Sequence, residues 1–274
     1  MPLRLPDRLP AIDLLKQENI FVMDNTRAHS QDIRPLKIVI LNLMPQKLEA
    51  EEEFYTMMDG AGVDILIVLA KMSGLTYKHT PQLYMDSFYT DIADIMDSNE
   101  TYDGMIITGA PIEHIEFEEV TYWTQIGEVY RWTMGHVRST LNICWGAFAA
   151  LKLFFNIDKL WTPDKLFGVY LHQVLPTHCL LTEGMPPEVM VPVSRHITMR
   201  REELEAQPEL TLLIDQQLTG PELAIAWDGL HIFANGHMEY AEGRLRFEYE
   251  RDLAKGLPID MPQHYYRADQ TETR

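Results

Sequence analysis

The stretch Ser139-Thr140-Leu141-Asn142-Ile143-Cys144-Trp145-Gly146-Ala147-Phe148-Ala149-Ala150-Leu151-Lys152-Leu153-Phe154-Phe155 changes its backbone period at a cysteine. Residues 139–143 alternate and are β-prone, whereas apolar residues after Cys144 recur at helical spacing. A strand that turns directly into a helix places Cys144 at a helix N-terminus, which favours thiolate and aims N–H groups at whatever the sulfur attacks. Because free cysteine is also common as a buried small hydrophobic residue, two interpretations stay open, nucleophile and core residue.

Working outward, strand-like and helical segments alternate along the first 155 residues. The predicted strands are 36–44, 63–70, 102–111 and 139–143, and the predicted helices are 49–59, 84–95, 123–134 and 145–155. This β–α order predicts a parallel sheet with helices on both faces. Ligands bind outside the carboxyl ends of such strands, where 42–47, 108–113 and Cys144 would converge. The glutamates at 49 and 51–53 are expected to form a solvated helix face.

The second half of the chain has a weaker pattern. Residues 159–200 are expected to form short strands and loops, followed by strands near 210–214, 222–227 and 230–240 and a helix over 245–255. Residues 1–35 are predicted to be irregular apart from a short strand at 20–23, and the polar tail 261–274 is expected to fray. With no linker of disorder-prone composition, we predict a single domain over 1–274.

Composition limits the function classes. Lys+Arg 23 against Asp+Glu 41 gives a net charge of −18, which argues against nucleic acid and anionic membranes as partners. No apolar run approaches the ~20 residues needed to span a bilayer, and the start of the chain lacks the apolar core of a signal peptide. The two cysteines, Cys144 and Cys179, do not make a disulfide framework, so a cytoplasmic location is predicted.

A thiol nucleophile needs a base and a group that orients the base. Among ten histidines, His237 follows a predicted strand and has a carboxylate, Glu239, two residues further on. In extended backbone these two side chains share one face, so Glu239 can fix the tautomer of the imidazole. No Cys-x-x-Cys or His-Glu-x-x-His spacing predicts a metal site, and no glycine-rich phosphate loop is present.

Motifs from about residue 5 to about 260 resemble the homoserine O-acyltransferase family of the MetA type. They are Leu41-Asn42-Leu43-Met44-Pro45, Ile107-Thr108-Gly109-Ala110-Pro111, Glu116-Phe117, Tyr122-Trp123, Ser139-Thr140-Leu141, Cys144-Trp145, Phe167-Gly168-Val169, Gly236-His237-x-Glu239-Tyr240 and Glu248-Tyr249-x-Arg251-Asp252. The resemblance implies a three-layer, flavodoxin-like fold of the class I glutamine-amidotransferase type. It also implies acyl transfer from coenzyme A to an amino-acid hydroxyl through an acyl-cysteine thioester.

Carried over by motif, Cys144 would be the nucleophile, His237 the base and Glu239 its orienting partner. Backbone N–H groups of Leu43 and Trp145 would form the oxyanion hole.

The resemblance further places Lys165, Ser194 and Arg251 around the amino-acid acceptor. Arg251 and Ser194 suit the binding of a hydroxy amino acid, because arginine can bind a carboxylate bidentately and serine can hydrogen-bond to a hydroxyl. Glu113 would select acetyl-CoA over succinyl-CoA, since a carboxylate in the acyl pocket fills space and repels the free carboxylate of succinate.

Three residues depart from the family pattern: Leu171 stands where glutamate is usual, Val193 where histidine is usual, and Met238 where proline is usual. The family's usual C-terminal Asn-Trp-Leu-Asn-Tyr segment is also missing. Two of the changes flank acceptor positions, and some short relatives act on L-serine, so the acceptor stays open between L-homoserine and L-serine. One methylene changes binding in a pocket by only about 1–3 kcal/mol.

These observations predict a cytoplasmic O-acetyltransferase of methionine or cysteine biosynthesis that follows a ping-pong mechanism. It would use acetyl-CoA as co-substrate and hold no permanent cofactor, and a homodimer is an expectation from the family. Three alternatives stay open: succinyl-CoA as the donor, a glutamine-amidotransferase-like amidase with the same Cys-His-Glu arrangement, and a non-enzymatic relative that binds without turnover.

Overall fold

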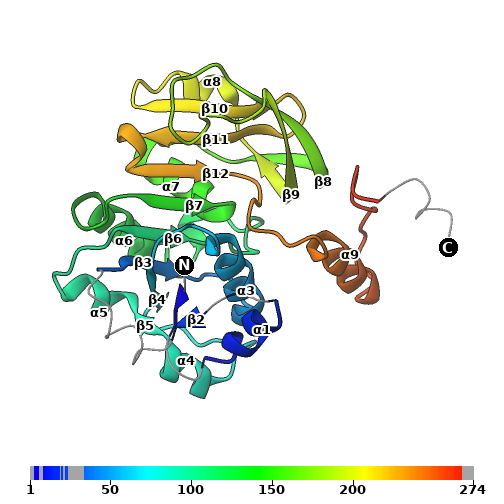
Figure 1. The fold of residues 1–274 in the computed structure, drawn as a ribbon. Helices are drawn as coiled ribbons and strands as arrows, with labels where there is room; N and C mark the ends of the chain where they lie inside the picture. Colours follow the sequence, from blue (N-terminus) through cyan, green and yellow to red (C-terminus); the bar gives the residue numbers. More distant parts are fainter. Residues whose placement is uncertain (1–2, 6–8, 19, 21, 24–33, 267–274) are drawn as a thin grey trace. The chain divides into compact units, whose positions relative to one another are not determined.

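The computed structural model describes residues 3–5, 9–18, 20, 22–23 and 34–266 of the chain (Figure 1). By its internal contacts the chain separates into two compact units, one of residues 1–111 and 115–142 and the other of 112–114 and 143–274. The single domain over 1–274 stays a prediction, because compactness does not measure whether a part folds alone.

The first unit is built on a parallel sheet. Its strands follow the order β2-β1-β4-β3-β6-β7, and β5 pairs with β4; all these pairs are parallel. The bounds are β1 Leu3–Arg4, β2 Val22–Met23, β3 Leu36–Leu41, β4 Ile65–Lys71, β5 Thr90–Asp91, β6 Gly104–Ile107 and β7 Thr140–Ile143. Side chains at 39–41 are fully buried, as expected for a strand covered on both faces.

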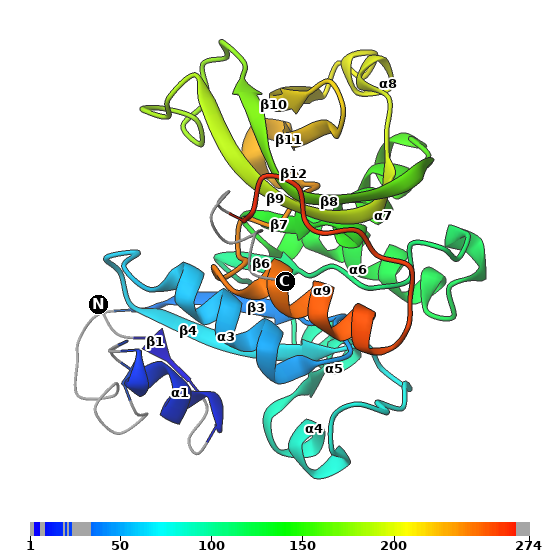
Figure 2. The same cartoon turned by 90° about the vertical axis from the view of Figure 1, so that its right-hand side faces the viewer.

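Helices cover both faces of this sheet, with α1 and α3 on one side and α5 and α6 on the other (Figures 1 and 2). The helices of the unit are α1 Ala11–Gln17, α3 Lys47–Met58, α4 Gln82–Phe88, α5 Ile92–Asp97, η1 Phe117–Glu119 and α6 Trp123–His136. The prediction of an α/β fold with a mostly parallel sheet between two helical layers is confirmed.

Three local predictions in this unit need correction. The helix expected over 84–95 is two helices, because the backbone becomes extended after α4 and β5 pairs with Ala70 and Lys71 of β4. Residues 11–17 form α1 where irregular structure was expected. The glutamate run of α3 is not wholly solvated, because Glu51 is fully buried and accepts hydrogen bonds from the hydroxyls of Tyr84 and Tyr89, both at 2.6 Å.

The second unit is built on antiparallel strands in the order β12-β11-β10-β8-β9. The bounds are β8 Leu160–Val174, β9 Glu188–Thr198, β10 Leu210–Gln216, β11 Gly220–Ala226 and β12 His231–Ala234, with helices α7 Trp145–Phe155, α8 Arg201–Glu205, η2 Trp227–Gly229 and α9 Arg244–Ala254. β8 and β9 are far longer than the short strands expected over 159–200. In β8 a register irregularity between Trp161 and Leu166 breaks the alternation that would have shown the length of that strand.

α9 is anchored to β8 by apolar contacts. Leu245 and Tyr249 of α9 form a buried cluster with Phe167 of β8. Gln263 continues this contact, since its N–H donates to the carbonyl of Phe167 and its carbonyl accepts from Val169, both at 2.9 Å. The chain is therefore held at 263, inside the tail expected to fray from 261, and residues 267–274 lie outside the described part.

Candidate functional site

Cys144 lies between β7 and α7, at the change of period seen in the sequence. Its backbone has φ 48° and ψ −120°, a conformation that residues other than glycine rarely adopt. Its N–H donates to the carbonyl of Ala234 on β12 at 2.7 Å, and its own carbonyl accepts from Ala147 in the first turn of α7. Such backbone strain costs roughly 1–3 kcal/mol and persists where the surroundings over-determine it, a feature common at active sites.

His237 and Glu239 are brought together after β12 as predicted, although by a turn at 237–240 and not by the extended backbone that the prediction assumed. Glu239 Oε1 lies 2.7 Å from His237 Nδ1, and both side chains are buried. The backbone N–H of His237 donates to the carbonyl of Pro192 on β9 at 2.9 Å. The ring stacks on Tyr240 with centroids 4.0 Å apart and planes inclined by 14°. The imidazole is therefore fixed in position by its backbone and by both of its neighbours.

The third member of the group, Cys144, interacts with the same ring. Burial acts to lower the pKa of His237, but the charges of Glu239 and Cys144 and hydrogen bonds to both raise it well above its usual value. A carboxylate on one side of the imidazole and the sulfur on the other therefore favour the imidazolium. This is the arrangement in which a histidine can take the proton of a thiol.

A buried carboxylate, Glu248 on α9, links the predicted acceptor residues. Ser194 donates to its Oε2 at 2.6 Å and Tyr240 donates to its Oε1 at 2.8 Å, while Lys165 Nζ lies 3.7 Å from Oε2. Burial acts to raise the pKa of Glu248, but Lys165, the Ser194 hydrogen bond, the charge of His237 and the Tyr240 hydrogen bond together hold it below its usual value. Glu248 is therefore ionised at neutral pH.

Arg251 lies on α9, three residues after Glu248. Its Nε and Nη2 donate to the two carboxylate oxygens of the adjacent Asp252 at 2.7 and 2.9 Å. This bidentate bond is the first cause of the lowered pKa of Asp252. The structure thus brings Lys165 and Ser194 together on Glu248, while the guanidinium of Arg251 contacts Asp252.

Glu113 belongs to the same compact unit as the groups above. Its Oε1 accepts the backbone N–H of His196 at 3.0 Å, and its carbonyl accepts from Lys159 Nζ at 2.7 Å. Burial raises the pKa of its carboxyl, an effect that the His196 N–H and the charges of His196, Lys165 and Arg195 partly offset. The side chain is therefore tied to β9 one residue beyond Arg195, on the strand that carries Ser194.

The two predicted oxyanion-hole residues fall in different compact units. Trp145 is the first residue of α7 and its side chain is fully buried. Leu43 follows β3 in the first unit, where its N–H donates to the hydroxyl of Thr108 at 2.8 Å. The role assigned to the Leu43 N–H therefore stays a prediction.

Of the three departures from the family pattern, Val193 faces away from Ser194, whereas Leu171 lies on the same face of the β8–β9 pair as Ser194, four residues along β8 from Phe167, the residue paired with Ser194. Val193 is fully buried in a cluster with Leu166 and Tyr170, on the face of β9 opposite to Ser194. The side chains of Leu171 and Met238 are each 46% exposed.

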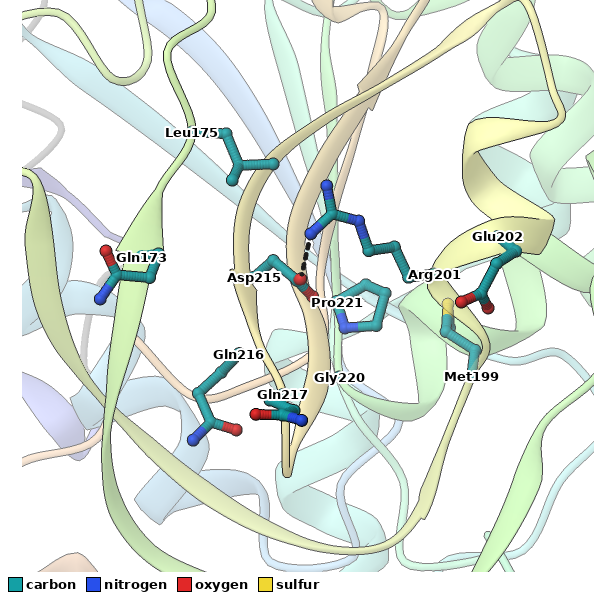
Figure 3. Close-up of a pocket in the computed structure, with 10 residues that line it drawn as sticks. All are labelled: Gln173, Leu175, Met199, Arg201, Glu202, Asp215, Gln216, Gln217, Gly220 and Pro221. Carbon is teal, nitrogen blue, oxygen red and sulfur yellow. Dashed lines mark hydrogen bonds and ion pairs between the residues drawn. The ribbon is translucent and has the colours of Figure 1, made fainter.

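A cavity of about 510 Å³ lies elsewhere in the second unit, between β8, β10 and the start of α8 (Figure 3). Its charged lining includes Arg201, which donates to Asp215 at 2.9 Å, as the dashed line in Figure 3 shows. Of the sequence-predicted site residues that the structure describes, none lines this cavity. It is therefore separate from the Cys144–His237–Glu239 group.

Within the described part of the chain no group of three or more His, Cys, Asp or Glu side chains is placed to hold a metal ion. None of its helices is both long enough and apolar enough to cross a membrane.

Sequence reasoning assigned no role to Glu248 or Tyr240. Both stand in motifs quoted for the family resemblance, and Glu248 lies three residues before Arg251, which places the two on one face of a helix. That spacing is the signal that could have shown Glu248. Glu222, which accepts the N–H of Gly236 directly before His237, has no comparable signal in the sequence.

Comparison with known proteins assigns the chain to a family. The family model described as Homoserine O-succinyltransferase matches residues 2–274. The chain belongs to this family. A homoserine O-acetyltransferase of Bacteroides thetaiotaomicron is 48% identical over 98% of this chain and 88% of its own length, and that of Bacteroides fragilis is 47% identical over 98% and 88%. As a member of this family the chain is an O-acyltransferase.

The predicted fold type is confirmed by a solved structure. A glutamine amidotransferase from Thermotoga maritima matches 87% of this chain and 94% of its own, with a TM-score of 0.57 and 11% sequence identity. At that identity the likeness concerns the fold alone, and the fold is that of the class I glutamine amidotransferases.

Proposed function

We propose that this enzyme transfers an acetyl group from acetyl-CoA to the side-chain hydroxyl of L-homoserine, through a thioester on Cys144, in methionine biosynthesis. The observation that carries the proposal is the buried His237 ring, which interacts with Cys144 and with Glu239 at once. A nucleophile, a base and an orienting carboxylate are the parts that covalent acyl transfer needs. Family membership and relatives named homoserine O-acetyltransferase support the same chemistry.

The reaction has two half-reactions that share one base. In the first, His237 takes the proton of Cys144 and the thiolate attacks the acetyl carbonyl. The carbon–sulfur bond to coenzyme A breaks, and the imidazolium gives its proton to the departing CoA thiolate. In the second, His237 takes the proton of the homoserine hydroxyl, whose oxygen attacks the thioester. The Cys144 thiolate leaves and recovers that proton, so the enzyme returns to its starting state.

The tetrahedral intermediate carries an oxyanion that needs N–H donors. The N-terminus of α7 offers such donors directly after Cys144, beginning with Trp145, and the helix dipole favours negative charge there. The N–H of Leu43 would be the second donor. It would exchange its bond to the Thr108 hydroxyl for one to the oxyanion.

The acceptor is an amino acid with a cationic and an anionic end. α9 offers a carboxylate at Glu248 and a guanidinium at Arg251 on one face, three residues apart. In our proposal Glu248 faces the substrate ammonium and Arg251 turns from Asp252 to grip the carboxylate. Lys165 and Ser194, both held by Glu248, complete the pocket that presents the hydroxyl to the thioester.

L-Homoserine rather than L-serine is proposed as the acceptor because Val193, the departure next to Ser194, does not face this pocket. Leu171 and Met238 are half exposed, and Val193 packs into a core cluster behind Ser194. The relatives of similar sequence carry homoserine in their names.

Acetyl-CoA is proposed as the donor because of Glu113. Its carboxyl, fixed by the His196 N–H, would fill the space that the longer succinyl group needs. In its ionised form it would also repel the free carboxylate of that group.

The deciding experiment incubates the protein with acetyl-CoA alone and examines it by intact-mass and peptide mass spectrometry. One acetyl group should appear on the peptide with Cys144, with release of one equivalent of CoA. Cys144→Ala should abolish both, and Cys179→Ala is the matched control, because Cys179 is the other free cysteine of the chain and should leave both unchanged. CoA release by Cys144→Ala at the wild-type rate would refute the mechanism.

A second measurement separates the acceptors and the reaction class. Steady-state rates with acetyl-CoA should favour L-homoserine over L-serine, and L-glutamine should yield no ammonia. A preference for L-serine would overturn the acceptor assignment alone. Ammonia release without dependence on CoA would replace the acyltransferase with an amidase.

A further inference from the structure

A buried carboxylate, Glu222 on β11, lies behind the segment that carries His237. Its side chain is 1% exposed, and the proposed reaction assigns it no step. Oε1 accepts the backbone N–H of Gly236 at 2.6 Å. The backbone carbonyl of the same glutamate accepts the N–H of Asn235 at 2.8 Å. One residue thus holds the two peptide groups that directly precede the proposed base.

The backbone leading into His237 is therefore held at three successive N–H groups. Those of Asn235 and Gly236 bond to Glu222, and that of His237 bonds to the carbonyl of Pro192 at 2.9 Å. Beyond the ring, Glu239 fixes Nδ1. Of these three N–H groups, only that of Gly236 donates to a side chain, the carboxyl of Glu222; the other two donate to backbone carbonyls.

The Glu222 carboxyl lies so close to Gly236 that a larger residue at 236 would displace it. A Cβ on Gly236 would lie 2.4 Å from Oε1 of Glu222 and 2.9 Å from its Cδ, well inside van der Waals contact. Without a Cβ, the backbone of Gly236 can approach the carboxyl directly; the Cβ of any other residue would occupy that space. The position of the Glu222 carboxyl therefore depends on the glycine at 236.

The surroundings of Glu222 allow it to accept this bond whether or not it is ionised. Its Oε2 lies 4.0 Å from Arg195 Nη1 and 3.7 Å from His172 Nε2. His172 donates from Nδ1 to the carbonyl of Tyr170 and its Nε2 lies 2.9 Å from the Thr219 hydroxyl, while burial lowers its pKa, so the ring is neutral at pH 7. Burial, opposed by Arg195, the Gly236 N–H and His237, raises the pKa of Glu222 to about 7.

We infer that Glu222 is a positioning residue for acyl transfer: by binding the Gly236 N–H it sets where the His237 imidazole stands against Cys144. It touches neither substrate nor reacting atoms. This inference rests on the proposed function, because it assigns Glu222 a role only through His237. Holding a base in place matters because a misplacement of 1 Å can cost about 100-fold in rate.

The test compares two substitutions at Glu222 that differ in one property. Glu222→Gln keeps an oxygen that can accept the Gly236 N–H, whereas Glu222→Ala removes the acceptor. We expect Glu222→Ala to lower kcat about 100-fold with unchanged KM for both substrates, and Glu222→Gln to recover most of that loss. Asp215→Asn is the matched control, since it alters another buried carboxyl of this sheet away from the 235–237 segment; it should leave kcat unchanged.

A second readout does not depend on any substrate. The rate at which iodoacetamide alkylates Cys144, measured against pH, reports the thiol and imidazole together. Its profile should change in Glu222→Ala and stay close to wild type in Glu222→Gln. Should the alanine variant not fold, Glu222→Asp takes its place, because a side chain shorter by one methylene withdraws the acceptor from Gly236.

Two results would overturn the inference. One is a folded Glu222→Ala enzyme with wild-type kcat and alkylation profile, and the other is a Glu222→Gln enzyme as impaired as the alanine variant. Failure of the proposed function looks different, because the wild type itself would then transfer no acetyl group to homoserine. The alkylation profiles of the two Glu222 variants would still differ in that case if the carboxyl positions His237.

Discussion

Replacing Glu239 by glutamine removes one charge from the catalytic group and changes little else. Oε1 of Glu239 lies 2.7 Å from His237 Nδ1, and the two side chains are 6% and 7% exposed. A hydrogen bond to a charged group contributes about 1–2 kcal/mol more than a neutral one. The charge of Glu239 raises the pKa of His237, so that pKa should fall in Glu239→Gln.

The rate should fall as well, by at least about tenfold, since about 1.4 kcal/mol of lost transition-state stabilisation has that effect. The loss can exceed this value because Oε2 of Glu239 has no hydrogen-bond partner among the described residues. Nothing therefore prevents the new amide from turning its NH₂ toward Nδ1 and imposing the unproductive tautomer of His237.

The assay is CoA release in the first half-reaction, followed against pH. His237 must be protonated to hand a proton to the CoA thiolate, so the rate should decline as pH rises through the pKa of His237. In Glu239→Gln this decline should begin at a lower pH, because the pKa of His237 is lower. Glu242→Gln, an exposed glutamate three residues on, is the matched control. An unchanged alkaline limb and rate in Glu239→Gln would refute the role of Glu239.

Three further predictions concern the donor, the acceptor and stability. Glu113→Gly should raise the rate with succinyl-CoA relative to acetyl-CoA about tenfold or more, and an unchanged ratio would remove the role given to Glu113. Ser194→Ala breaks a 2.6 Å bond to the ionised Glu248, so KM for homoserine should rise about tenfold, while acetylation of Cys144 by acetyl-CoA alone keeps its rate. Burial raises the pKa of Glu222 from its usual 4.5 to about 7 in the folded protein, so the folded state holds this proton more tightly than the unfolded state. The stability that Glu222 contributes is therefore fully present below pH 4.5 and is lost as pH rises to 7. Denaturant unfolding at both pH values should show the wild type losing about 3 kcal/mol more over this range than Glu222→Gln, and parallel curves would contradict the buried titration.

The sequence located the strained cysteine and its histidine partner because each has a local signature. The change of period at Cys144 follows from backbone geometry alone. His237 and Glu239 do meet as expected, but through a turn after β12 ends at Ala234 and not along the extended backbone that the i, i+2 argument assumed. The parallel sheet followed from the alternation of strands and helices in the first 155 residues.

The rest could not be predicted because it depends on partners distant in the chain. Ser194 reaches Glu248 across 54 residues, and no spacing rule connects a serine on a strand with a glutamate on a helix. Glu51 stands in an acidic run that predicted a solvent-exposed helix face. In the structure it is buried, and Tyr84 and Tyr89, more than 30 residues later in the chain, donate hydrogen bonds to it. Glu222 stands in a strand with no nearby group of opposite charge in the sequence.

The position of Glu248 has a consequence for how acceptor specificity can change during evolution. One of its oxygens binds Ser194, and the other binds Tyr240, whose ring lies against His237 at 4.0 Å. A substitution that reshapes the acceptor pocket through Glu248 therefore also disturbs the packing and charge around the base. Relatives that adopt a new amino acid should change residues around Glu248 and keep the glutamate itself, because pocket shape can then diverge while the proton transfer machinery is inherited intact.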